Sequence, residues 1–154
     1  MPLSRGTFSS EADRREMGMG EHRNITRWRE MREAFFRGDI EPALALYAPD
    51  IVWTNDEAAG PQAGRHEGLE AVLIMLGAGM ESFDGTLTQE VHETLASDDF
   101  VVEIMTERAV VKGHHFENRA VYLYRLEDDK IVEVSTLDRD RAAAERFWAN
   151  VLSD

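Results

Sequence analysis

The segment of residues 35–53, FFRGDIEPALALYAPDIVW, constrains the fold of this chain more than any other. Gly38 is placed to end one helix, and Asp39 can cap a second, short helix predicted over residues 40–47. Pro49 then ends the helical stretch, and a strand is predicted over residues 51–55. Two helices with a tight break between them, followed at once by a strand, form a compact unit that the rest of the chain must cover.

The remaining elements follow from hydrophobic periodicity. One apolar stripe with helical spacing precedes this segment, and its members are Ile25, Trp28, Met31 and Phe35. A third helix is predicted over residues 69–80, after a loop rich in Gly, Pro and Ala. Strand-like runs separated by turn-forming residues come next, over residues 86–95, 100–111, 120–126 and 130–137, and a last helix over 141–152. Helices first and antiparallel strands after them indicate an α+β fold.

Length and charge limit the classes of partner. A chain of 154 residues is long enough for one domain with a substantial core, and it has no cysteine for disulfides or thiolate chemistry. Its formal net charge of −13 argues against nucleic acid and anionic membranes as partners. No apolar run approaches the ~20 residues that cross a bilayer, and no signal peptide is evident, so a cytoplasmic location is expected. Residues 1–20 are predicted to be a disordered tail, and residues 21–154 the folded domain.

Three pieces of the sequence carry a family resemblance. They are GDIEPALALYAPDIVW, the GRHEG of residues 64–68 before a helix, and the ending KIVEV followed by RAAAERFW. Together they resemble the SnoaL-like domains of the nuclear transport factor 2-like superfamily, from about Trp28 to Trp148. The resemblance implies a cone-shaped, cystatin-like fold, with three N-terminal helices on a curved, mainly antiparallel sheet, a C-terminal helix and a deep apolar pocket. It does not imply one reaction, because the superfamily includes isomerases, cyclases, epoxide hydrolases, dehydratases and binding proteins.

Three positions where relatives carry acids hold neutral residues in this chain, and they are Asn55, Val110 and Thr136. The general base of ketosteroid isomerases would fall at Asn55, which cannot accept a proton at neutral pH. The acid on the last strand of cyclases and epoxide hydrolases maps onto Thr136 or a close neighbour. The isomerases' oxyanion donors fall at Met31, which donates nothing, and at Tyr122, which keeps a hydroxyl. These departures favour either altered catalysis or a protein that has lost its catalytic carboxylates.

Strand alternation divides residues 100–111 into two faces. One face carries Val102, Ile104, Thr106, Arg108 and Val110, and the other carries Glu103, Met105 and Glu107. We expect the first, mostly apolar face to line the cone, so that Arg108 points into it. The resemblance to epoxide hydrolases supports this, because they have an arginine at that position, although Val110 replaces their aspartate. The second face, with Val101 and Leu123, is then expected to pack against a second copy in a homodimer. Arg108 as half of a structural ion pair, and Trp53 as plain core, remain open alternatives.

The predicted function is binding of a small hydrophobic carbonyl or carboxylate compound, with isomerisation, dehydration or cyclisation without a cofactor as the possible reaction. The alternative is a non-catalytic binding or accessory protein. The candidate catalytic residues are Asp138 and His92 as proton carriers, with Tyr122 and Arg108 stabilising negative charge. The candidate ligand-binding residues are Trp53, Asn55, Met31, Phe35, Met75, Ile104, Tyr124 and Thr136. No metal site is expected, because the histidines do not have the i, i+4 spacing of helical metal sites.

Overall fold

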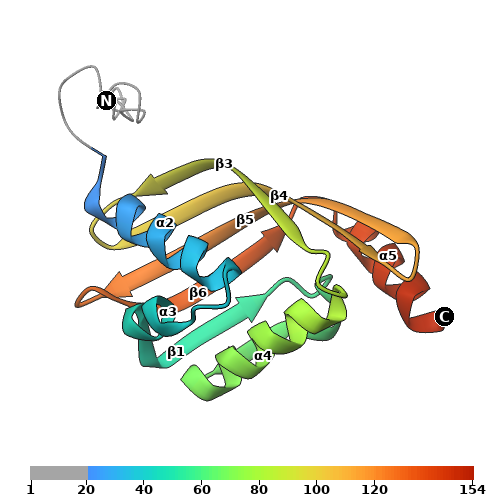
Figure 1. Ribbon diagram of the computed structural model, residues 1–154, viewed down its shortest axis with the longest axis horizontal. Coiled ribbons are helices and arrows are strands. Elements are labelled where there is room, and N and C mark those ends of the chain that lie inside the picture. Colours follow the sequence, from blue (N-terminus) through green and yellow to red (C-terminus); the bar gives the residue numbers. More distant parts are fainter. Residues whose placement is uncertain (1–20) are drawn as a thin grey trace, which may run out of the picture.

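The computed structural model describes residues 21–154, so the disordered tail predicted over residues 1–20 lies outside the described part of the chain. Within that part, one curved sheet carries α2, α3 and α4 on one side, and α5 lies at one end (Figure 1). The helices are α2 (Arg23–Phe36), α3 (Glu41–Leu46), α4 (Leu69–Ser82) and α5 (Arg141–Ser153), with a 3-10 turn, η1, at Gly60–Gln62. The α+β class predicted from the order of elements is confirmed.

The sheet has the strand order β2-β1-β6-β5-β4-β3. Its strands are β1 (Tyr47–Asn55), β2 (Gly64–Glu67), β3 (Thr88–Ala96), β4 (Phe100–Val111), β5 (His114–Glu127) and β6 (Lys130–Asp138). β1 and β6 pair in parallel, and all other neighbours pair antiparallel. The central strand β5 therefore lies between β4 and β6, which brings side chains from three strands together on each face.

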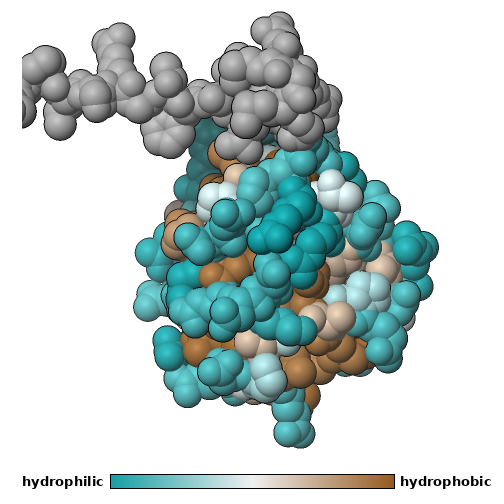
Figure 2. All heavy atoms as spheres, turned by 90° about the vertical axis from the view of Figure 1, so that its left-hand side faces the viewer, coloured by the Kyte–Doolittle hydropathy of each residue, from teal (hydrophilic) through white to brown (hydrophobic). Residues whose placement is uncertain are grey.

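The breaks between elements have the local chemistry that the sequence indicates. Gly38 has a φ of 84°, which ends α2, and the carboxylate of Asp39 accepts the Glu41 N–H at 3.2 Å. At the other end of the chain, Asp140 accepts the Ala143 N–H at 2.9 Å and caps α5. The face of the molecule seen in Figure 2 is largely hydrophilic, with hydrophobic residues exposed in patches.

The turn between β4 and β5 is tighter than predicted. Residues Lys112 and Gly113 form it with positive φ values of 48° and 81°, so Val111 pairs directly with His114. A two-residue turn of this kind matches the twist of the flanking strands. As a result β5 begins six residues before the predicted strand of residues 120–126, and the whole β4–β5 ladder is fixed by this one turn.

The predicted inner face of β4 is wrong. Glu103, Met105 and Glu107 are buried against the helices, whereas Ile104 and Arg108 lie on the outer face of the sheet. The physical reason is that the faces of a strand alternate, so choosing the wrong set reverses every side chain. Glu103 and Glu107 are consequently interior residues and not dimer contacts, and the same correction applies to Met105 and Val101, which are fully buried in a single chain.

Two apolar clusters hold the sheet and helices together. The larger one packs α2, α3 and α4 against the inner face of the sheet, and it includes Trp28, Tyr47, Ile51, Trp53, Val72 and Val134. The smaller one fixes α5 to the far end of the sheet through Phe83, Phe116, Phe147 and Trp148. The polar side chains described next lie between these clusters.

Candidate functional site

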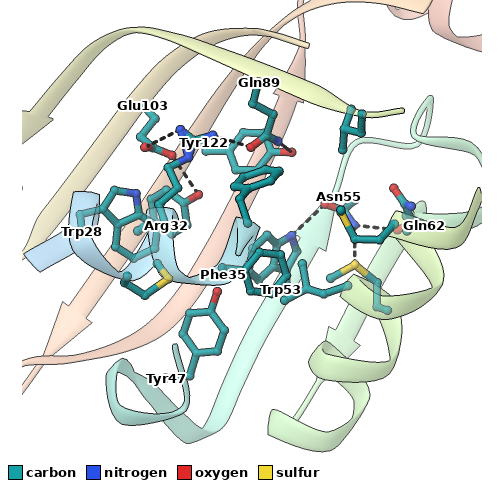
Figure 3. A pocket seen from close by; sticks show the side chains of 18 of the residues that line it. Trp28, Arg32, Phe35, Tyr47, Trp53, Asn55, Gln62, Gln89, Glu103 and Tyr122 are labelled. Carbon is teal, nitrogen blue, oxygen red and sulfur yellow. Dashed lines mark hydrogen bonds and ion pairs between the residues drawn. The ribbon is translucent and has the colours of Figure 1, made fainter. Parts of the chain in front are cut away.

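A cavity of about 110 Å³ opens between α2, α4 and the inner face of the sheet. Aromatic rings make up much of its wall, and Figure 3 shows the side chains that surround it. The aromatic residues in the wall are Trp28, Phe35, Phe36, Tyr47, Trp53, Phe83, Tyr122 and Tyr124. A smaller lobe of about 60 Å³ shares Asn55, Gln62 and Tyr122 with this cavity and continues to Glu107, Thr136 and Asp138. The site is therefore an aromatic chamber with a polar inner end.

Glu103 forms the first of two buried polar groups in the wall. It is 2% exposed, lies 3.5 Å from the guanidinium of Arg32 and accepts the Tyr124 hydroxyl at 3.3 Å. Burial raises the pKa of Glu103, and the nearby positive charge of Arg32 offsets part of that rise. Arg32 also donates to the Gln89 side-chain oxygen, as Figure 3 shows.

Glu107 forms the second group, four residues further along β4 on the same face. Its Oε1 atom accepts the Tyr122 hydroxyl at 2.8 Å and the Gln89 amide nitrogen at 2.7 Å. Burial raises the pKa of Glu107, and it also raises the pKa of Tyr122. Gln89 connects the two groups, because its oxygen binds Arg32 and its nitrogen binds Glu107.

Asp138 is the carboxylate best suited to proton transfer. Its side chain lines the smaller lobe and accepts a hydrogen bond from Asn118 Nδ2 at 2.8 Å. Burial, followed by the negative charges of Glu107 and Asp56, raises the pKa of Asp138 to about 6. A carboxyl group with a pKa near the working pH can both accept and return a proton.

Asn55 lies in the wall of the cavity, where four hydrogen bonds hold its amide, one of them to the Met75 sulfur at 3.3 Å. Its oxygen accepts the Trp53 indole N–H at 2.8 Å and the Thr136 hydroxyl at 3.0 Å. Its nitrogen donates to the Gln62 carbonyl at 2.8 Å. Both ends of the amide are thus committed to protein groups, and Asn55 fixes the ring of Trp53 instead of accepting a proton.

Most of the residues selected from the sequence line the two lobes. Met31, Phe35, Trp53, Asn55, Met75, Tyr122 and Tyr124 line the larger lobe, and Thr136 and Asp138 line the smaller one. Their roles in binding and catalysis stay predictions.

Three of the selected residues lie outside the cavity, on the outer face. Arg108 is bound by Glu90 and Glu117, each at 2.8 Å, so it is half of a structural ion pair. The His92 ring lies 2.7 Å from the Thr106 hydroxyl, and Ile104 is 37% exposed. The reversed faces of β4 explain the positions of Arg108 and Ile104. His92 lies on β3, for which the sequence assigns no face.

The sequence reasoning missed the polar interior, which consists of Arg32, Gln89, Glu103, Glu107 and Asn118. One signal could have found it. Tyr122 was placed in the cavity, and a two-residue turn at Lys112-Gly113 sets Tyr122 directly opposite Glu103. Directly opposite residues share a face, so an inward Tyr122 requires an inward Glu103.

Residues 21–154 contain neither a membrane-spanning helix nor a metal-binding cluster. In this described part, no helix is long and apolar enough to cross a membrane. In the same residues, no group of three or more His, Cys, Asp or Glu side chains is arranged to hold a metal ion.

Comparisons with known proteins agree with this architecture. The family model described as a SnoaL-like domain matches residues 28–134. An uncharacterized protein of Mycobacterium tuberculosis is 30% identical over 119 residues, which cover 75% of this chain and 88% of the relative. A Xanthomonas campestris protein with a cystatin-like fold superimposes with a TM-score of 0.72 at 28% identity, covering 82% of this chain and 98% of that one.

IdmH of Streptomyces antibioticus, named as a candidate polyketide cyclase, has the same fold, with a TM-score of 0.66 at 23% identity. The match covers 83% of this chain and 99% of IdmH. The cone-shaped, cystatin-like fold expected from the sequence is confirmed by these structures. On the evidence of the family model and the mycobacterial relative, the chain belongs to the family of SnoaL-like domains.

Proposed function

We propose that this protein catalyses cofactor-free proton transfer on a small hydrophobic carbonyl compound bound in the cavity. The observation that carries the proposal is Asp138, a half-buried carboxyl with a pKa of about 6 in the same lobe as Tyr122 and Glu107. Perturbed carboxyls inside a cavity are typical of catalytic acids and bases.

The reaction needs two protein groups. The Asp138 carboxylate accepts a proton from the carbon next to the substrate carbonyl, and the C–H electron pair forms the enolate. The Tyr122 hydroxyl donates a hydrogen bond to the enolate oxygen. When the substrate is a β,γ-unsaturated ketone, this enolate is a dienolate, and Asp138 then returns the proton to its γ-carbon as the double bond moves into conjugation. This completes an isomerisation without an oxidant or reductant. Dehydration and cyclisation begin with the same enolate.

The charges in the cavity favour a neutral substrate. Of the described residues that line the two lobes, Glu103, Glu107 and Asp138 carry carboxyl groups, and Arg32 carries a guanidinium. Arg32 is already bound by Glu103 and Gln89. With Arg108 on the outer face, a carboxylate substrate has no free cation to bind, so a ketone or aldehyde is the better fit.

The test is hydrogen exchange at the carbon next to a carbonyl. β-Tetralone and cyclohexanone are incubated with the protein in deuterated buffer, and loss of the proton signal is followed by NMR. We expect protein-dependent exchange of at least one probe, and the same rate for His92→Gln, because His92 lies on the outer face. Binding of a probe without any exchange would reject the proton-transfer proposal.

A second candidate function is ligand binding without catalysis. The observation that favours it is Asn55, which stands where isomerase relatives carry their base and whose amide is fully engaged by the protein. Binding without exchange is the result expected for such a protein. Glu107 and Asp138 weigh against it. Burying carboxyl groups lowers the stability of the fold, and a role in catalysis would explain why they are buried.

We also propose a homodimer, formed by the outer face of the sheet. The apolar residues there lie in adjacent rows on β3, β4, β5 and β6, and they are Leu95, Val102, Ile104, Val121, Leu123 and Leu137. Leu95 and Leu137 are 45% and 58% exposed in the single chain, and a contiguous apolar face is typical of an interface. This replaces the dimer face expected from the sequence.

Light scattering should report twice the chain mass of 17.5 kDa. Leu123→Asp should shift the protein to the monomer mass, because it places a charge at the centre of this face. Ile74→Asp is the matched control, since Ile74 is 65% exposed on α4, away from the outer face. A wild-type monomer, or a dimer that survives Leu123→Asp, would contradict the assignment.

A further inference from the structure

Asn118 lies on β5, the strand between the two strands that carry the inner carboxyls Glu107 and Asp138. It is 4% exposed on β5, directly opposite Glu107 on β4. Its Nδ2 atom donates to Asp138 on β6 at 2.8 Å. Its Oδ1 atom is buried and has no hydrogen-bond partner among the described residues. Buried acceptors are nearly always paired, so this oxygen needs an explanation.

Glu107 can supply the missing partner only if it carries a proton. Side chains directly opposite on antiparallel strands have Cβ atoms about 4.5–5.5 Å apart, within reach of two carboxyl and amide groups. The hydrogen bonds that Glu107 accepts from Tyr122 and Gln89 both go to Oε1, which leaves Oε2 for another contact. Two oxygens repel unless a hydrogen lies between them, and a proton on Oε2 would provide it.

We propose that Asn118 is a positioning residue that makes Glu107 and Asp138 hold one proton between them. In the observed orientation, in which the amide nitrogen donates to Asp138, Glu107 is protonated and Asp138 is ionised. The amide donates to one carboxyl through its nitrogen and accepts from the other through its oxygen. Flipping the amide exchanges the two partners, but the number of protons on the two carboxyls stays at one. The carboxyl that faces the amide oxygen must always carry the proton. The shared proton therefore does not depend on how the amide is oriented.

The surrounding charges agree with a single proton. Glu107 faces Tyr122 from β5, Gln89 from β3 and, at longer range, the positive charge of Arg32 from α2. Asp138 faces Glu107, Asp56 after β1 and Arg141 of α5, and Arg141 is itself bound to Asp56 at 2.9 Å. Burial raises the pKa of both carboxyls, and an ionised Glu107 raises the pKa of Asp138 further, so ionising both at once is unfavourable.

This arrangement deepens the proposed function, on which its catalytic consequence rests. A neutral Glu107 holds the Tyr122 hydroxyl less strongly than a carboxylate would, and Gln89 continues to satisfy Oε1. The hydroxyl can then turn to the oxygen of a bound substrate, while the ionised Asp138 is ready to accept a proton. Asn118 would thus assign the two roles without touching the substrate.

The test is a carboxyl titration by carbon-13 NMR of the substrate-free protein and Asn118→Ala. The variant removes the donor to ionised Asp138, so the pKa of Asp138 should rise. It also removes the acceptor for the Glu107 proton, so the pKa of Glu107 should fall. We expect opposite shifts of about one unit each, the size of one hydrogen bond. Shifts in the same direction, or none, would overturn the proposal.

Asn24→Ala is the matched control. Asn24 is equally buried, at 2% exposed, and its oxygen is also unpaired among the described residues, but it lies at the start of α2 and donates to Ser97. This variant should leave both titrations unchanged.

If Asn118→Ala fails to fold, infrared spectra of the wild type and Glu107→Gln test the shared proton instead. At pH 7 the wild type should show a protonated-carboxyl band that Glu107→Gln removes, and an unchanged band would reject the shared proton.

These outcomes are separable from those of the exchange assay, because the titration needs no substrate. A protein without exchange activity could still hold the shared proton. Conversely, an active enzyme in which Asn118→Ala leaves the pKa values of Glu107 and Asp138 unchanged would support the proposed function and contradict the shared proton.

Discussion

Replacing Asp138 with Asn should slow exchange of the probe ketones by about 10²–10⁴-fold, the usual contribution of a general base. The amide cannot accept a proton from carbon at neutral pH. Its oxygen can still accept the hydrogen bond from Asn118 Nδ2, so the fold should be retained. The rate is measured by NMR in deuterated buffer, with circular dichroism to verify folding.

His92→Gln is the paired variant for this prediction. His92 was an equal candidate for the proton carrier in the sequence, but its ring binds Thr106 on the outer face. Its exchange rate should match that of the wild type. A folded Asp138→Asn variant with wild-type exchange, or a large loss in His92→Gln, would mean that another group carries the proton.

Gly60→Ala should lower the free energy of unfolding by about 3 kcal/mol, the combined cost of backbone strain and overpacking. Gly60 has a φ of 61°, and a Cβ atom there would overlap the indole ring of Trp148. The turn that it begins also supplies Gln62, whose carbonyl holds Asn55 in the cavity wall. Chemical denaturation measures the loss, and a weaker response of Trp148 fluorescence to folding should accompany it.

Gly38→Ala separates the two causes. Gly38 has a φ of 84°, but a Cβ atom there would meet nothing within 4 Å. Its substitution should therefore cost only the strain, about 1 kcal/mol. Equal losses in the two variants would show that contact with Trp148 contributes nothing, which would contradict the packing described for α5.

The fold could be predicted because its signals are local. Gly38 and Asp39 mark the break between α2 and α3, and the apolar stripe of α2 reports its own buried face. The face of β4 could not be chosen in the same way. Its inner residues include Glu103 and Glu107, and its outer residues include Ile104, so hydrophobicity favours the wrong set.

The candidate site was predictable only where it agreed with ordinary burial rules. The aromatic wall, with Trp53 and Tyr124, follows from residues that are favoured inside a protein. The buried carboxyls do not, because their burial depends on partners from other strands and helices. Arg32 approaches Glu103 from α2, and Asn118 reaches Asp138 from β5, pairings that no local pattern reveals. The one sequence signal for the buried carboxyls is the β4–β5 turn, whose register places Glu103 opposite Tyr122.

The pH dependence of ketone exchange tests the central claim most directly. If Asp138 is the base, it must be ionised, so the rate should rise with pH through a midpoint near its pKa of about 6. The ordinary pKa of an aspartate is 3.8, so the midpoint expected for Asp138 lies about two pH units above the midpoint expected for an ordinary aspartate. A rise centred near pH 6 that disappears in Asp138→Asn is the predicted result. A midpoint near pH 4, or a midpoint near 6 that persists in Asp138→Asn, would contradict the assignment of Asp138 as the proton carrier.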